Sequence, residues 1–308
     1  MAFLCQHPAM ASPQFHRLVE RLRARPKPAN PTMAELRAGF AALAQQYPPP
    51  ADAHFETVDA GGARAEWVSV PESRPSRVLL YFHGGGYGIG SAETHRDLVA
   101  RLCRAAGARA LSVDYRLAPE HRYPAAVEDA VASYRWLLDQ GVPPDAIAVA
   151  GDSAGGGLAL GALLALRDKA VPLPAAAVCM SPVTDHLKTG ASMETKAALD
   201  PIVQRQSSTA NSKRYIGEGD PKAPYASPLY ADLRDLPPIL ILVGTAEVLL
   251  DDSTRFAERS RAASVETDIE VWEDMIHIWP FFADIPEAGK AVERMAAFIR
   301  AKLKPEDR

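Results

Sequence analysis

The chain has 308 residues, of which 47% are hydrophobic and 23% charged, and its formal net charge at pH 7 is -4. This length suits one large α/β domain with a substantial core, and the composition is that of an ordinary globular protein. The mild negative charge gives no reason to expect binding to nucleic acid or to a membrane, so we expect a small-molecule partner.

Three cysteines, Cys5, Cys103 and Cys179, lie far apart in the sequence and do not have the spacing of metal ligands. We interpret them as free thiols in a reducing compartment. No stretch of the sequence reaches the roughly 20 apolar residues of a membrane span. We therefore expect a cytoplasmic protein without a bound metal.

Residues 1–50 predict helical pieces that are separated by prolines. Apolar residues recur at helical spacing within 14–25 and again within 32–46. Such a segment lies outside any sheet. It is either a lid or interaction arm or a packed decoration of the domain, and the sequence leaves both interpretations open.

From residue 54 onward, strand-like runs alternate with helical ones. We expect strands at 54–58, 64–70, 78–82, 108–115, 146–150, 175–180, 239–243 and 268–272, and helices at 95–106, 125–140, 158–166, 253–263 and 287–302. This alternation predicts a mostly parallel sheet of about eight strands with helices on both faces and ligands near the carboxyl ends of the strands. The first two strands, joined through Gly61 and Gly62, predict an antiparallel hairpin at one edge.

The alternation stops between residues 181 and 238, where the chain is polar and one helix is expected over 203–215. This insertion and the N-terminal segment are the two parts of the chain that lie outside the sheet pattern. We expect them to fold together over the sheet.

Residues 151–156 read GDSAGG and lie between a short apolar strand and a helix rich in alanine and leucine. This is the G-x-S-x-G pattern of a nucleophile elbow, in which Ser153 occupies a strained turn with its hydroxyl exposed. The flanking Gly151 and Gly155 remove the Cβ atoms that would clash in so tight a bend. The alternative is a Gly/Ser turn without chemistry.

A second glycine-rich motif, HGGG at residues 83–86, directly follows the strand at 78–82. Successive glycines let the backbone approach a substrate and direct N–H groups at one oxygen. We predict an oxyanion hole formed by the N–H groups of Gly84, Gly85 and Ala154. A flexible turn or a phosphate cradle is the alternative, but the sequence contains neither G-x-G-x-x-G nor a P-loop lysine at these positions.

The general base and its acid follow from chain order. His277 is the histidine that lies late in the chain after a strand, as the order Ser, acid, His requires, although a lone histidine is often a core residue. Glu247 is the first carboxylate after the strand at 239–243, so we predict it as the acid. Asp251 and Asp252 are the competing candidates, and a helix start enriched in acidic residues is the alternative without chemistry.

On these motifs, together with DYRLAPEH at residues 114–121, the chain resembles the hormone-sensitive-lipase family of α/β-hydrolase carboxylesterases over about residues 77–303. The resemblance implies an α/β-hydrolase catalytic domain over residues 51–308. It also implies a helical cap built from the segment 1–50 and from an insertion at 185–235. In this family a Ser-acid-His triad hydrolyses esters through an acyl-enzyme without a cofactor, and many members form homodimers.

Two positions depart from the family pattern. The acid is usually aspartate in Asp-Pro-Leu-x-Asp, whereas residues 247–251 read EVLLD. Glutamate is one methylene longer but holds an imidazole N–H equally well. Asp274 and Ile278 replace the two glycines that the family often has around the histidine. We therefore expect changed pocket walls near His277.

The expected function is hydrolysis of short- to medium-chain acyl esters by a serine esterase. Tyr87, Trp279, Phe281 and Phe282 are candidate walls of an acyl site, although each is equally compatible with the core. An amidase or deacetylase would use the same triad. A non-catalytic receptor is the alternative from another class, because plant gibberellin receptors resemble this family but lack the histidine; the presence of His277 favours an enzyme.

Overall fold

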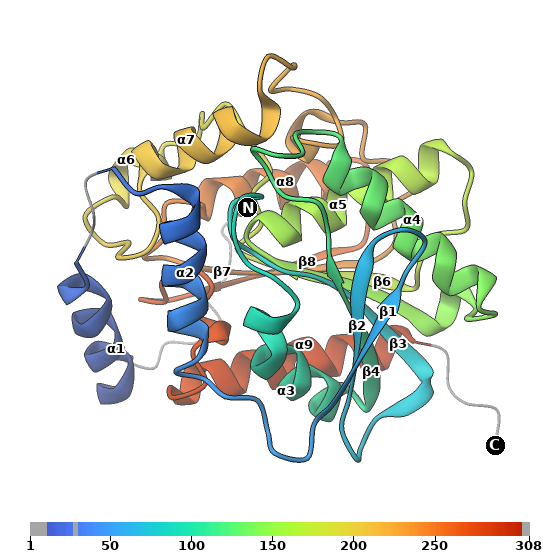
Figure 1. Cartoon of the computed structure of the whole chain (residues 1–308). Coiled ribbons are helices and arrows are strands. Elements are labelled where there is room, and N and C mark those ends of the chain that lie inside the picture. Colours follow the sequence, from blue (N-terminus) through green and yellow to red (C-terminus); the bar gives the residue numbers. More distant parts are fainter. Residues whose placement is uncertain (1–10, 27–29, 304–308) are drawn as a thin grey trace.

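The computed structural model describes residues 11–26 and 30–303, and its centre is one eight-stranded sheet in the order β1-β2-β4-β3-β5-β6-β7-β8 (Figure 1). The strands are β1 (His54–Asp59), β2 (Arg64–Ser69), β3 (Arg74–Phe82), β4 (Ala108–Asp114), β5 (Ile147–Asp152), β6 (Ala176–Met180), β7 (Ile239–Gly244) and β8 (Thr267–Trp272). The pair β1–β2 and the pair β2–β4 are antiparallel, and all other neighbours are parallel. The mostly parallel sheet and its edge hairpin are confirmed.

The central strands are buried on both faces, as parallel strands flanked by helices must be. Every residue of β5, β6 and β7 is buried, whereas the edge strand β1 has none that is fully buried. Several boundaries differ from the predictions by one to four residues. The largest shifts are at the start of β3, which begins at Arg74 rather than at residue 78, and at the start of the helix after Ser153, which begins at Ala154 rather than at residue 158. β3 extends to Arg74 because that residue still pairs with Ala108 of β4, beyond an irregularity in the register.

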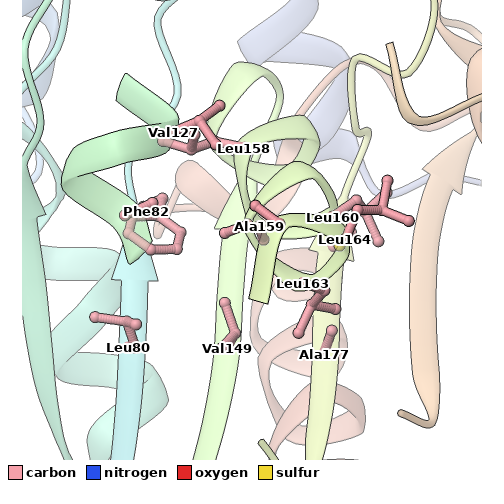
Figure 2. Packing of buried hydrophobic residues seen from close by; sticks show 14 of the residues in the cluster. Leu80, Phe82, Val127, Val149, Leu158, Ala159, Leu160, Leu163, Leu164 and Ala177 are labelled. Atoms are coloured by element: carbon pink, nitrogen blue, oxygen red, sulfur yellow. The ribbon is translucent and has the colours of Figure 1, made fainter. Parts of the chain in front are cut away.

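Helices cover both faces of the sheet, which confirms the predicted layers. One face carries α4 (Ala125–Asp139), α5 (Ala154–Asp168) and α8 (Leu250–Ala262), and the other carries α3 (Arg96–Ala106) and α9 (Pro286–Lys302). Figure 2 shows the leucines of α5 above Val149 and Ala177. Every residue of α5 from Ala154 to Leu166 is buried, so this helix is fixed at the centre of the domain.

Four further helices lie outside this layered core: α1 (Pro13–Ala24), α2 (Met33–Ala44), α6 (Ser192–Thr195) and α7 (Arg205–Ile216). The predicted helices α1, α2 and α7 are confirmed, whereas the one-turn helix α6 was not predicted. α1 buries Phe15, Leu18 and Leu22 against the core. α2 begins with a capping box between Thr32 and Glu35, yet none of its residues is buried.

Short 3-10 helices complete the described part of the chain: η1 (Glu93–His95), η2 (Pro144–Ala146), η3 (Pro228–Tyr230) and η4 (Trp279–Phe281). None of the helices in residues 11–26 and 30–303 combines the length and the apolar character that a membrane span requires.

Candidate active site

The turn between β5 and α5 holds Ser153 in a strained conformation, with φ 53° and ψ -117°. Its N–H donates to the carbonyl of Met180 at 2.8 Å, which ties the turn to the end of β6. A Cβ at Gly155 would lie 2.0 Å from the carbonyl oxygen of Phe82, so only glycine fits there. The predicted strand, sharp turn and helix are therefore present, with α5 beginning directly after the serine.

Ser153, His277 and Glu247 form a continuous hydrogen-bonded chain. The Ser153 Oγ lies 2.9 Å from His277 Nε2, and His277 Nδ1 lies 2.8 Å from Glu247 Oε2. All three side chains are buried, and Ser153 is the most accessible of them at 8% exposure. Residues from three separate strand ends thus meet at one edge of the sheet, as parallel strands permit.

The other two candidate acids have different partners. Asp251 Oδ2 accepts the N–H of Ser192 at 2.9 Å, and Asp252 Oδ2 accepts the N–H groups of Thr184 and Asp185. Neither forms a hydrogen bond or ion pair with His277 in the described part of the chain. Glu247 is the candidate that the structure brings to the histidine.

Glu247 is held by two donors on the oxygen that faces away from the imidazole. Ser181 Oγ donates to Oε1 at 2.8 Å, and the Gly244 N–H donates to the same oxygen at 2.7 Å. Ser181 Oγ also accepts the N–H of Ile278 at 3.3 Å. Sequence reasoning missed Ser181, although its place just after β6 puts it at the edge where the other strand ends meet.

The environment of His277 favours its protonated form. Burial by itself lowers the pKa of the imidazole, but the hydrogen bond to Glu247 and the negative charges of Glu247 and Asp200 outweigh it and raise the pKa above 6.5. The carboxylate therefore both orients the ring and stabilises the positive charge that the ring acquires when it takes a proton.

The glycine loop differs from the prediction at Gly84. The Gly84 N–H donates to Asp152 Oδ1 at 2.9 Å, so it is already engaged and is not a free oxyanion donor. Gly85 and Gly86 line the same cavity as Ser153, and their N–H groups have no partner among the described residues. Ala154 is the first residue of α5, where backbone N–H groups lack a helical acceptor. Three amides are thus free at the predicted site, with Gly86 in the place of Gly84.

Asp152 anchors that loop from inside the core. Its side chain is fully buried, and Oδ1 also accepts the Tyr81 hydroxyl at 2.8 Å and lies 3.4 Å from His95 Nε2. Burial opposes ionisation of Asp152, but the nearby imidazole of His95 and the hydrogen bond from the Tyr81 hydroxyl lower its pKa. Asp152, the residue before Ser153, therefore fixes the position of the glycine loop relative to the elbow.

A cavity of about 270 Å³ opens beside Ser153 and His277. One part of its wall is apolar and comes from α2, from the segment before α7 and from the loops that carry Glu247 and His277: Leu36, Phe40, Ile202, Val203, Leu249 and Ile278. Ile278 replaces a family glycine, so the expected change in the pocket wall is present. Tyr87 also lines the cavity, whereas Trp279, Phe281 and Phe282 belong to the core and do not.

The helix α7 is joined to the glycine loop through two aromatic rings. Tyr87 follows the loop directly and stacks on Tyr215 of α7, with ring centroids 3.7 Å apart and planes within 4°. A Cβ at Gly86 would lie 2.3 Å from the side-chain nitrogen of Asn211, so the loop backbone also packs closely against α7. The insertion is therefore in direct contact with the glycine loop.

The likeness to known proteins covers most of the chain. Residues 79–281 match the family described as alpha/beta hydrolase fold. A solved esterase from the bacterial hormone-sensitive lipase family superposes with a TM-score of 0.93 at 45% sequence identity, covering 96% of this chain and 100% of that one. The chain belongs to the hormone-sensitive-lipase family of α/β-hydrolase carboxylesterases.

Curated relatives of this hydrolase agree with that assignment. An acetyl-hydrolase from Streptomyces hygroscopicus is 46% identical over 82% of this chain and 83% of its own length. An esterase from Acinetobacter venetianus is 34% identical over 85% of this chain and 87% of its own length. The family resemblance, the fold and the hydrolase class predicted from the motifs are confirmed.

Proposed function

We propose that this hydrolase cleaves short- to medium-chain acyl esters through an acyl-enzyme, with Ser153 as nucleophile, His277 as general base and Glu247 as the orienting acid. The observation that supports these roles is the unbroken chain of contacts at 2.8 and 2.9 Å from Glu247 through His277 to Ser153. A serine so placed is activated by the adjacent base.

In the first step Ser153 Oγ attacks the ester carbonyl carbon while its proton passes to His277 Nε2. The imidazolium that forms is stabilised by Glu247 across the Nδ1 contact. We assign the developing oxyanion to the free N–H groups of Gly85, Gly86 and Ala154. His277 then gives its proton to the leaving alcohol, and water repeats the sequence to release the acid.

The size of the cavity supports small substrates. Its volume of about 270 Å³ lies just below the roughly 300–1,000 Å³ of sites for drug-sized ligands. The wall formed by Leu36, Phe40, Ile202 and Val203 suits a short or medium alkyl chain. A long acyl chain would have to extend out of this space into solvent.

We also propose that residues 1–50 and 185–235 form a cap over a catalytic domain that spans 51–308; residues 1–10, 27–29 and 304–308 of these ranges lie outside the described residues. This proposal is supported by α2 and α7, one from each segment, which both line the cavity.

Homodimer formation stays a prediction. A cytoplasmic location also stays a proposal, supported by the buried, unpaired thiols of Cys103 and Cys179; Cys5 lies outside the described residues.

The proposal is tested by hydrolysis of a series of p-nitrophenyl esters, from acetyl to palmitoyl, by wild type and Ser153→Ala. We expect wild type to be most active on short and medium chains and Ser153→Ala to lose on the order of 10⁴ to 10⁶ in kcat. Ser260→Ala is the matched control, because Ser260 is also buried and hydrogen-bonded but lies in α8 away from the cavity. Substantial activity of Ser153→Ala would refute the assignment.

A further inference from the structure

The cavity beside Ser153 carries positive side chains and no negative ones. Lys188 and Arg214 both line it, whereas no Asp or Glu does among the described residues. Uncharged donors from α7, Ser208 and Asn211, line it as well. A site for purely aliphatic esters needs none of these groups. The polar wall therefore indicates a ligand that carries negative charge and hydrogen-bond acceptors.

Of the two cations, Lys188 is the stronger evidence for an anionic ligand because its side chain is buried. Its side chain lies in the loop after β6 and is 4% exposed. Within residues 11–26 and 30–303 its ammonium forms no hydrogen bond and no ion pair. Nζ itself is not among the buried atoms without a partner that are fully shut off from solvent, so it keeps some access to the cavity that Lys188 lines. A buried charge without a partner is costly, and proteins normally pair it.

Two acids, Asp252 and Asp185, act on Lys188 through their charge but form no ion pair with it in the described part of the chain. Asp185 accepts hydrogen bonds from Thr189 and Tyr230 and forms an ion pair with Arg255. Asp252 accepts backbone N–H groups through Oδ2, and its Oδ1 has no partner, but it forms no ion pair with Lys188. Their charges offset that of Lys188 only from a distance, which leaves the ammonium available to the cavity.

Arg214 is similarly free of a carboxylate. Its guanidinium Nη1 donates to the sulfur of Met33 at 3.4 Å, and no ion pair joins it to an acid in the described part of the chain. Since guanidinium and ammonium groups bind carboxylates through charge-assisted hydrogen bonds, the two cations suit the same type of ligand.

We propose that the cavity selects esters that carry a free carboxylate in addition to the ester group, with Lys188 as the residue that recognises the carboxylate and Arg214 as a second donor. The alkyl part of such a substrate lies against the apolar wall. This inference rests on the proposed esterase function and narrows its substrate class.

The titration of Lys188 agrees with this role. Burial lowers the pKa of its ammonium, and the charges of Asp252 and Asp185 compensate only in part. A carboxylate bound in the cavity would raise that pKa again, because an opposite charge nearby favours the charged form. Binding of the substrate and protonation of Lys188 would therefore reinforce one another.

The test compares kcat/KM for matched esters, measured by pH-stat titration of the acid released. Monomethyl adipate against methyl hexanoate places the carboxylate on the acyl side, and 4-acetoxybutyrate against butyl acetate places it on the alcohol side. The proteins are wild type, Lys188→Met and Lys213→Met. Lys213 is the matched control because it is exposed on α7, next to Arg214, and does not line the cavity.

We expect wild type to prefer the anionic ester in at least one pair, which identifies the side of the ester that Lys188 faces. Lys188→Met should lower the anionic-to-neutral ratio of kcat/KM by about tenfold or more, and Lys213→Met should leave that ratio unchanged. A wild-type ratio below one in both pairs, or an equal ratio in wild type and Lys188→Met, overturns the inference while the esterase function stands. Absence of hydrolysis with all four esters overturns the esterase function as well.

A second measurement needs no variant and so does not depend on how Lys188→Met folds. Adipate and hexanoate are compared as competitive inhibitors of p-nitrophenyl butyrate hydrolysis by wild type. We expect the inhibition constant of adipate to be lower by about tenfold, because only adipate has a second carboxylate for Lys188. Equal inhibition constants would overturn the inference.

Discussion

Ser181 Oγ donates a 2.8 Å hydrogen bond to Glu247 Oε1, the carboxylate oxygen that His277 does not contact. With the Gly244 N–H on the same oxygen, it leaves Oε2 free to face the imidazole. Ser181 is therefore a positioning residue, which acts on the histidine through the acid.

Ser181→Ala should lower kcat about three- to tenfold and change KM less than about twofold, because one of the donors that orient Glu247 is lost while the cavity is intact. Steady-state kinetics with p-nitrophenyl butyrate separate the two parameters. Ser260→Ala serves again as the control for loss of a buried hydroxyl. An unchanged kcat in Ser181→Ala would show that Gly244 alone suffices to hold the acid.

Glu247→Gln should reduce kcat by about 10³ to 10⁴, since an amide can present an N–H to His277 Nδ1 and so favour the wrong tautomer. Asp251→Asn should change kcat less than about threefold, because asparagine keeps an oxygen for the Ser192 N–H. The kcat values of the two purified variants, compared with that of wild type, decide whether Glu247 or Asp251 is the acid. The reverse result would move the acid to Asp251.

The pH dependence follows from the raised pKa of His277. His277 accepts a proton only when neutral, so kcat/KM should fall as the pH decreases through a midpoint above 6.5. A profile of kcat/KM from about pH 5 to pH 9 gives the midpoint of this decrease. A wild-type midpoint at or below 6.5 would contradict the prediction.

The same shift in the pKa of His277 also affects the stability of the fold, because protonated His277 stabilises it. That contribution to the free energy of unfolding is complete below pH 6.5 and is lost as the pH rises through the raised pKa.

In Glu247→Gln the residual activity should have its acidic limb at lower pH than in wild type. The substitution removes both the hydrogen bond of a carboxylate and its charge, which raise the pKa of His277, and leaves burial, which lowers it. An unshifted limb would mean that another group controls the profile.

Gly85→Ala should abolish most activity, with a loss of about 10² or more in kcat. A Cβ there would lie 2.2 Å from the carbonyl oxygen of Ile89, and the residue has a φ of 122°, so the loop backbone and its free N–H must shift. Gly39→Ala is the control, since Gly39 lies in α2 with no atom within 4 Å of a Cβ. That change should raise stability by about 0.5–1 kcal/mol, measured as Tm, without loss of activity.

Most of the fold was predictable because hydrophobic periodicity and glycine turns are local signals. The eight strands and the positions of Ser153, His277 and Glu247 at their ends follow from the order of elements along the chain. The short helix α6 was missed because one turn of helix has almost no periodicity to detect.

The details of the site were less accessible because they depend on contacts between distant residues. Whether the Gly84 N–H points at a substrate or at Asp152 is decided by a partner 68 positions away in the sequence. The polar wall of the cavity was missed for the same reason. Lys188 and Arg214 look like ordinary surface residues in the sequence, and only the folding of the loop after β6 and of α7 brings them to Ser153.

The stack of Tyr87 on Tyr215 joins α7, which lines the cavity, to the glycine loop. We expect a displacement of α7 to shift the amides of Gly85 and Gly86 as well, so that the proposed selectivity is linked mechanically to turnover. Substitutions on α7 made to accommodate a different ester will change the rate of the chemical step together with the preference, and engineering of one property must be judged by both.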